Sequence, residues 1–216
     1  MRGASAGLGR PSFAARAPGW ARTVSAAAAS GRTGDRLRAA ARDLFYEHGI
    51  RAVSVDTVAA RAGVTKVTLY QHYRSKNQLL ADALREHSKL RHGSLQDYID
   101  GLGGPAAERL LGVFRWYEEL PAQENFRGCP LINAEVEVGH TNPEVREIVA
   151  AHKRTIRELL ARLVRDAELP DPDTVAGQLQ LLAEGAISMA LVEGSAEPTR
   201  RARTAAASLL GTTRAP

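Results

Sequence analysis

The sequence contains little cysteine, has few aromatic residues and lacks a long hydrophobic run. The single Cys129 excludes an internal disulfide and suits a reducing compartment, so we expect a cytoplasmic protein. Aromatic residues make up only 5% of the 216 residues, and together with abundant alanine this favours helices over sheets. No apolar run approaches the roughly 20 residues of a membrane span, so no membrane partner is expected.

The sequence also lacks the residue patterns of common enzyme sites. It has no Cys–His spacing signature, no glycine-rich phosphate loop and no metal-ligand cluster, and its six histidines are scattered along the chain. An enzyme that uses Cys129, or Glu135 with Glu137, is therefore the weaker alternative. We expect no enzymatic activity, no metal and no cofactor.

Basic residues are concentrated in the front of the chain. Residues 1–34 hold five arginines and no acid, and residues 35–92 hold eleven basic and six acidic side chains. Residues 93–216 hold thirteen basic and eighteen acidic ones, and the whole chain carries +5. A basic front joined to an acidic rear is typical of a nucleic-acid-binding module attached to a module of another kind.

Residues 1–32 are mostly Ala, Gly, Arg and Ser without hydrophobic periodicity, which predicts a disordered basic arm. One interpretation is that this arm contacts DNA. A misassigned start codon and a tail without function are the alternatives. An organellar transit peptide would also be rich in arginine and poor in acids, but the domain that follows argues against it.

Helical periodicity begins near residue 35 and continues along the chain, without strand-like alternation. Ser54 can cap one short helix, and Thr65 can cap a second at about Lys66–His72. Two short helices joined by a tight turn around Gly63 form a helix-turn-helix. In such a motif the second helix lies in the major groove and presents its outer face to the bases.

Start signals predict longer helices behind this motif. Residues Ser75–Gln78 form a capping box that opens a fourth helix. Asn142-Pro143, Asp171-Pro172 and Pro198 open three later helices, because proline fits the first helical position. The fold is therefore expected to be all-α.

The residues themselves point to one family. Residues 54–80 (SVDTVAARAGVTKVTLYQHYRSKNQLL) strongly resemble the N-terminal domain of the TetR family of bacterial regulators, and residues 41–54 (ARDLFYEHGIRAVS) resemble its first helix and loop. The specific resemblance covers about residues 33–85. It implies an N-terminal three-helix helix-turn-helix DNA-binding domain at 33–78, followed by a larger helical ligand-binding and dimerisation domain at 79–216.

The resemblance also implies which residues contact DNA. Tyr70, Tyr73 and Lys76 match positions that contact phosphates, although Tyr70 and Tyr73 have an alternative role in closing the small core. Lys66 can bind guanine acceptors and Gln71 can bind adenine. The predicted DNA-binding residues are Ser54, Thr65, Lys66, Val67, Thr68, Tyr70, Gln71, His72, Tyr73 and Lys76.

A second segment carries a narrower resemblance. Residues 126–137 (FRGCPLINAEVE) resemble a Gly-Cys-x-x-x-Asn segment of a TetR subgroup, some of whose members sense electrophiles or oxidants through that cysteine. A thiol at a helix start can have a lowered pKa. The alternative is that Cys129 is a small buried hydrophobe. The predicted effector-pocket residues are Phe114, Trp116, Tyr117, Phe126, Cys129, Asn133 and His152.

Together these patterns predict a transcriptional regulator, most simply a repressor that a small-molecule effector releases from a double-stranded DNA operator. A homodimer is expected, because two recognition helices must reach two half-sites. A DNA binder without sequence preference, driven by the basic arm, is the remaining alternative. The dimer contact is expected at small residues of the last two helices, namely Ala183, Gly185, Ala186, Ala190, Ala202 and Ala206. The alternative is that these helices complete the core of the monomer.

Overall fold

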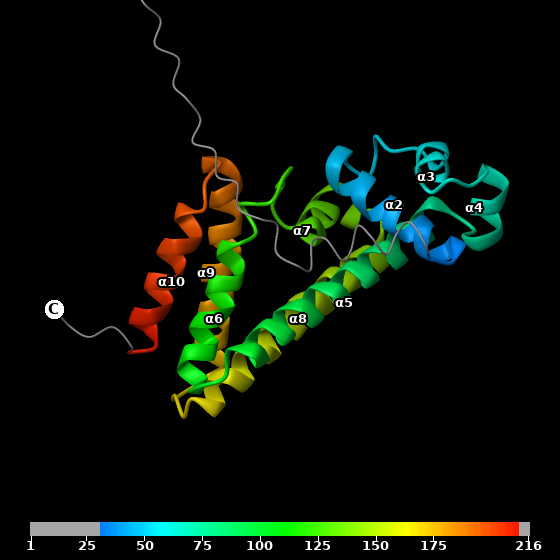
Figure 1. Ribbon diagram of the computed structural model, residues 1–216. Helices are drawn as coiled ribbons and strands as arrows, with labels where there is room; N and C mark the ends of the chain where they lie inside the picture. Colours follow the sequence, from blue (N-terminus) through cyan, green and yellow to red (C-terminus); the bar gives the residue numbers. More distant parts are fainter. Residues whose placement is uncertain (1–30, 212–216) are drawn as a thin grey trace, which may run out of the picture.

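The computed structural model describes residues 31–211, and within this range it is helical without strands, which confirms the all-α prediction. The predicted basic arm lies outside the described residues except for Gly31 and Arg32. Figure 1 shows a head of short helices at one end of an elongated molecule and α10 at the other. The helices are α2 (Thr33–His48), α3 (Val55–Arg61), α4 (Lys66–His72), α5 (Lys76–Leu102), α6 (Ala106–Glu118), α7 (Pro130–Ala134), the π-helix η1 (Glu135–Gly139), α8 (Pro143–Asp166), α9 (Pro172–Glu193) and α10 (Glu197–Leu209).

Local caps set the boundaries of the two short head helices. The Ser54 hydroxyl accepts a hydrogen bond from the backbone N–H of Thr57 at 3.1 Å. The Thr65 hydroxyl accepts one from the N–H of Thr68 at the same distance. Gly63 takes a positive φ of 66°, which allows the tight turn between α3 and α4. The predicted helix-turn-helix is therefore confirmed.

Side-chain caps are present at two of the four later starts, those of α5 and α8. The Asn142 side chain accepts from the N–H of Val145 at 3.3 Å at the start of α8. Ser75 caps α5, but the Gln78 side chain accepts from the N–H of Arg74 and does not complete the box at Ser75. Helix α9 begins at Pro172 as predicted, although Asp171 adopts a left-handed conformation and makes no side-chain cap.

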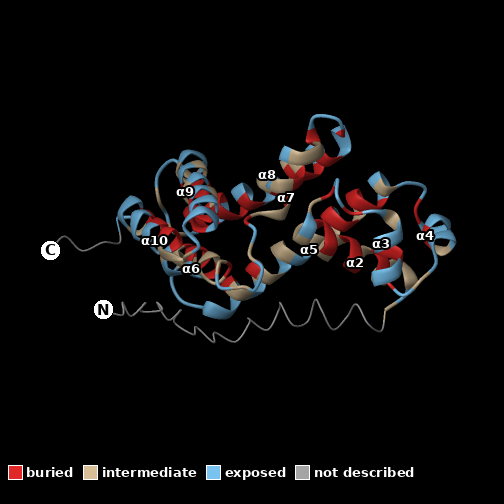
Figure 2. Ribbon diagram, turned by 90° about the horizontal axis from the view of Figure 1, so that it is seen from above, coloured by how far each residue is buried: buried red, intermediate tan, exposed pale blue. Residues whose placement is uncertain are grey.

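Two hydrophobic cores run through the molecule, and the burial pattern follows them (Figure 2). The first joins α2, α3, α4 and the beginning of α5 to α7 and the first turns of α8. The second joins the rest of α5 to α6, α8, α9 and α10. Because residues 79–84 pack in the first core, the head and the first part of α5 form one packed unit.

Helix α9 bears on two expectations. Although polar and charged residues interrupt its apolar sequence, it is by length and composition alone long and apolar enough to cross a membrane. The reason is that α9 is apolar on two sides, one of which packs against α8 and α10. The small residues expected at a dimer contact are mostly on that inner side, since five of them are buried within the single chain: Ala183, Ala186, Ala190, Ala202 and Ala206.

Candidate DNA-binding surface and effector pocket

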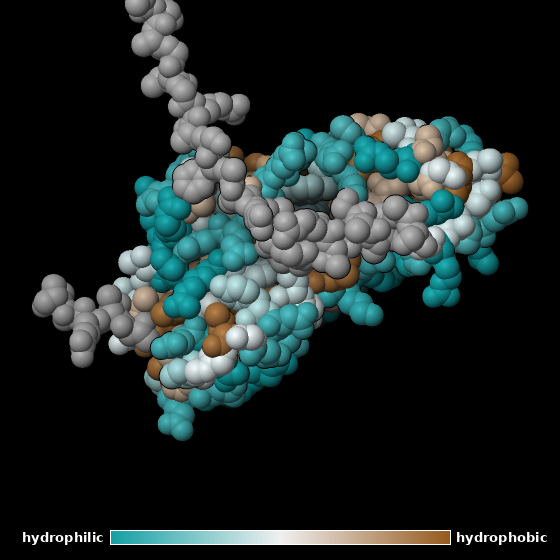
Figure 3. Space-filling view, viewed as in Figure 1, coloured by the Kyte–Doolittle hydropathy of each residue, from teal (hydrophilic) through white to brown (hydrophobic). Residues whose placement is uncertain are grey.

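Helix α4 presents a polar face at the tip of the head. Its anchor is Leu69, which is fully buried in the first core. Figure 2 shows the rest of this short helix largely exposed, and Figure 3 shows hydrophilic and hydrophobic atoms mixed at this end of the molecule. The exposed predicted residues here are Thr65, Lys66, Val67, Tyr70, Gln71 and His72, with Ser54 exposed on the neighbouring helix and Thr68 half-buried.

The charge of Lys66 is held in place by a neighbouring helix. Its ammonium lies 3.0 Å from the Asp56 carboxylate near the start of α3. This pair raises the pKa of Lys66 further above neutral pH. Both groups are exposed, so the pair can exchange for a base or phosphate contact at little cost.

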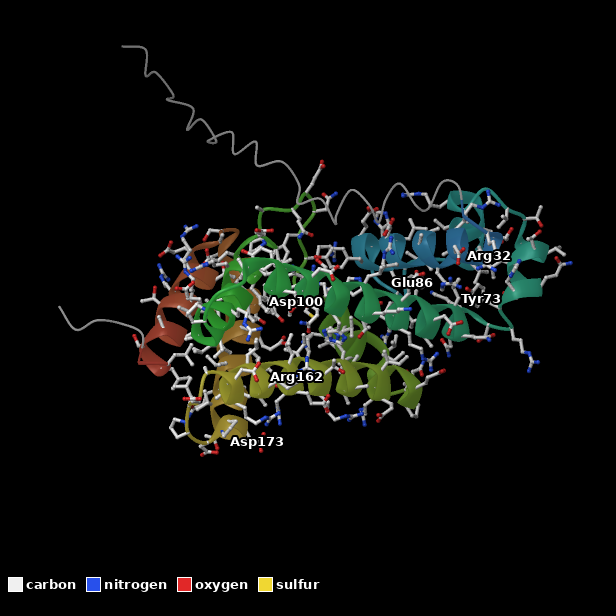
Figure 4. All side chains as sticks on the ribbon, turned by 60° about the horizontal axis from the view of Figure 1, so that its bottom comes forward. Arg32, Tyr73, Glu86, Asp100, Arg162 and Asp173 are labelled. Atoms are coloured by element: carbon white, nitrogen blue, oxygen red, sulfur yellow. The ribbon has the colours of Figure 1, made fainter. Side chains whose placement is uncertain are left out.

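Tyr73 is the predicted contact that the structure places inside the head. Its side chain is buried, with 4% exposed, and its hydroxyl accepts from the Arg38 guanidinium at 3.3 Å and donates to the Gly34 carbonyl at 3.4 Å. Burial raises the pKa of Tyr73. Figure 4 shows Tyr73 beside Arg32 at the start of α2, with Glu86 further along α5. Of the two roles that the sequence leaves open for Tyr73, the structure shows core packing.

Lys76 also points into the protein. Its ammonium donates to the Ile50 carbonyl and lies 5.7 Å from the centre of the Phe45 ring. Burial lowers the pKa of Lys76, while the nearby Glu137 carboxylate opposes this effect. A phosphate contact at this position requires the side chain to leave the Ile50 carbonyl, and it stays a prediction.

The seven predicted pocket residues do not line one common cavity. Phe114 and Trp116 are buried in the second core, and Tyr117 packs edge-on against Trp116 at 5.3 Å between ring centres. Asn133 and His152 line two separate smaller cavities. Phe126 alone of the seven lines a cavity of about 800 Å³ between α2, α5 and the loop that precedes α7.

Cys129 lies at the edge of both cores and is half-buried. The Lys153 ammonium donates to its sulfur at 3.7 Å and also pairs with Glu184 on α9. This arrangement is compatible with a packed thiol and with a thiol held beside a cation. Both roles of Cys129 therefore stay open.

The 800 Å³ cavity is lined by residues that sequence reasoning did not select, among them Arg42, Tyr46, His87, Arg91 and Gln123. A signal for two of them exists on α5. The buried positions 80 and 84 are followed at helical spacing by His87 and Arg91, so polar residues interrupt an inward-facing stripe. Such an interruption indicates a cavity or a polar network.

Comparison with known proteins agrees with this geometry. The family model for bacterial regulatory proteins of the tetR family matches residues 37–83, and the model for the tetracyclin repressor-like C-terminal domain matches residues 106–206. The HTH-type transcriptional repressor KstR2 of Mycolicibacterium smegmatis is 32% identical over 80 residues, which are 37% of this chain and 38% of KstR2. The match therefore spans about two fifths of that relative's length.

Solved structures show the same fold over most of the chain. SCO4454, a TetR-family transcriptional regulator from Streptomyces coelicolor, has a TM-score of 0.76 at 24% identity, covering 83% of this chain and 95% of SCO4454. Reduced Escherichia coli NemR has a TM-score of 0.73 at 22% identity, covering 82% of this chain and 97% of NemR. Since the two family models together match more than half of the residues, this chain belongs to the TetR family of bacterial regulators.

Proposed function

We propose that this protein is a sequence-specific transcriptional repressor that binds its operator as a homodimer and is released by a small-molecule effector. The observation that carries the proposal is the exposed polar face of α4, held by the buried Leu69 at the tip of the head. A helix presented in this way fits the major groove of DNA.

The chemistry of this face suits base recognition. Lys66 can donate to the O6 and N7 atoms of guanine, and Gln71 can form two hydrogen bonds with adenine. The methyl groups of Val67 and Thr68 can contact the methyl group of thymine. Base reading is assigned to the residues between Thr65 and His72, most of which are exposed.

The outer face of α9 supports the homodimer. Leu181 and Val192 are 74% and 77% exposed, and they share one side of the helix with Gly177, Gly185 and Ser188. A Cβ placed on either glycine would meet nothing within 4 Å, so the surface is open to a second helix. Large exposed apolar side chains beside small residues are typical of a helix that packs against a partner. The two-fold arrangement would place two α4 helices on two half-sites.

The effector would act by shifting a population between two dimer geometries. A ligand that binds more tightly to the dimer form whose spacing does not match the half-sites shifts the population toward that form. The difference between the ligand's affinities for the two forms sets how far the affinity for DNA falls. The 800 Å³ cavity supports this step, because it is lined by α2 of the head as well as by α5. A ligand there contacts both the head and the rear domain.

The direct test is selection of binding sites from random DNA, followed by footprinting of the selected site. We expect one enriched sequence with two related half-sites, and reduced enrichment for Gln71→Ala. Binding should also be measured against salt concentration, because a non-specific binder shows a steep salt dependence without any preferred site. Recovery of no preferred sequence would overturn the proposal.

A further inference from the structure

We infer that the cavity between α2, α5 and the loop before α7 receives an amphipathic organic anion. Arg91 and Gln123 would bind its acidic group, and the aromatic residues of the wall would contact its apolar part. This inference rests on the proposed function, because it names the chemical class of the effector.

The size and lining of the cavity suit an organic molecule. Its volume is about 800 Å³, within the range of pockets that hold drug-sized ligands. Tyr46 on α2, Leu90 and Tyr98 on α5, and Phe126 on the loop line the wall. Aromatic and aliphatic side chains from three elements therefore surround the space in which the apolar part would lie.

Arg91 places a positive charge in this wall. Its guanidinium lies over the Trp116 ring, 4.7 Å from the ring centre, which fixes the position of the charge. Burial lowers the pKa of Arg91, so the charged form is less stable here than in water. The neighbouring phenols of Tyr46 and Tyr117 have raised pKa values and are neutral at pH 7. A carboxylate or sulfonate bound beside Arg91 would stabilise its charged form, because a nearby opposite charge favours ionisation.

Gln123 adds a second donor to the same cavity. Its side-chain nitrogen is buried and has no hydrogen-bond acceptor among the described residues. A buried donor of this kind favours a ligand that supplies an acceptor. Carboxylate and sulfonate oxygens are strong acceptors for both an amide and a guanidinium.

The acidic side chains of the cavity do not oppose an anion at Arg91. Asp43 is paired with Arg42 at 3.0 Å, and Glu47 lies 3.9 Å from Arg61. Asp97 and Glu124 are exposed, where water and salt screen their charge. The acids therefore lie in pairs or at the exposed rim.

Two fluorescent probes that differ in one acidic group test the inference on the full chain. One is 8-anilinonaphthalene-1-sulfonate, and the other is the neutral N-phenyl-1-naphthylamine. We expect the unsubstituted protein to bind the sulfonate at least about tenfold more tightly, as a charge-assisted contact requires. Arg91→Gln should remove this preference while leaving the affinity for the neutral probe within about threefold. Arg91→Lys should retain part of it.

The matched control is Arg165→Gln, which removes an exposed positive charge from the end of α8, a helix that does not line the cavity. It should leave the preference unchanged. If circular dichroism shows that Arg91→Gln is unfolded, Gln123→Ala tests the inference in its place. This variant removes the second donor from a loop, so it should weaken binding of the sulfonate probe and leave binding of the neutral probe unchanged. Equal affinities for the two probes, or a preference that survives in the folded variants, would overturn the inference. Operator binding of the ligand-free variants is measured in parallel. A variant that binds the operator but not the anion has lost only the anion site, whereas absence of operator binding in the unsubstituted protein would contradict the proposed function.

Discussion

The Glu137 carboxylate accepts a hydrogen bond from the backbone N–H of Ile50 at 2.9 Å, across 87 positions in the sequence. The same carboxylate accepts from the N–H of Arg51 at 2.5 Å, and the Arg51 guanidinium donates to the Glu137 carbonyl at 2.8 Å. These bonds attach η1 to the loop between α2 and α3. The loop that leads into the helix-turn-helix is therefore hydrogen-bonded directly to η1.

We expect Glu137→Ala to lower the free energy of unfolding by about 1–3 kcal/mol, because two backbone donors lose a charged acceptor. Glu137→Gln should lower the free energy of unfolding by less, since one acceptor oxygen remains. Urea denaturation measures both changes. Val136→Ala is the control, because Val136 is 78% exposed on the same π-helix. Equal losses in the free energy of unfolding for the substitutions at positions 136 and 137 would contradict a stabilising role for the hydrogen bonds of Glu137.

Gln71→Ala should weaken binding to the selected operator by about 1–3 kcal/mol and relax the preference at one base pair of each half-site. The reason is the loss of a two-bond contact with a base edge. Fluorescence anisotropy at fixed salt measures the affinity, and repeated selection measures the preference. Arg74→Ala, an exposed residue beyond the end of α4, should leave the preference unchanged. An unaltered preference in Gln71→Ala would exclude Gln71 from base reading.

Val192→Asp should convert the dimer into a monomer, because it buries a carboxylate without a partner in the proposed α9 contact. Analytical ultracentrifugation gives the mass. Val136→Asp is the matched control, since the two valines are about equally exposed but lie on different elements. A dimer that persists in Val192→Asp would remove α9 from the interface.

The protein should lose stability as the pH falls below about 6.5. Burial, with contributions from Lys153 and His92, lowers the pKa of His152 to about 3. Between about pH 6.5 and pH 3 the unfolded imidazole therefore binds a proton that the folded one does not, and stability falls by up to about 1.4 kcal/mol per pH unit. Below about pH 3 this contribution stops changing.

Urea denaturation at pH 7.5, 6 and 5 measures this dependence, and about 2 kcal/mol should be lost by pH 5 through His152. His152→Gln should make the dependence shallower. Some dependence should remain, because burial also lowers the pKa values of His87 and His92. An identical slope in the variant would show that His152 does not carry the effect.

The two roles of Cys129 predict different responses to N-ethylmaleimide. A sensing thiol would lower operator affinity on alkylation, and Cys129→Ser would abolish that loss. A thiol that serves only packing would leave operator affinity unchanged in both proteins. Anisotropy with the selected operator, after alkylation and removal of excess reagent, distinguishes the two outcomes.

The sequence by itself determined the local structure of this protein. Ser54, Thr65 and Asn142 each accept a hydrogen bond from an N–H three residues later, so these helix starts depend only on neighbours in the chain. The helix-turn-helix follows from two such caps and the positive φ of Gly63. The all-α fold follows in the same way, because helical periodicity is a local pattern.

Only the tertiary structure decided which way particular side chains face. A tyrosine side chain can contact a phosphate or pack in a core, and packing against α2 places Tyr73 inside the head. The alanines of α9 and α10 suit a dimer or a monomer interior, and the contact between these two helices buried them in one chain. The cavity beside Arg91 and the link between Glu137 and Ile50 join segments far apart in the sequence. They arise from the packing of whole helices, which no local pattern specifies.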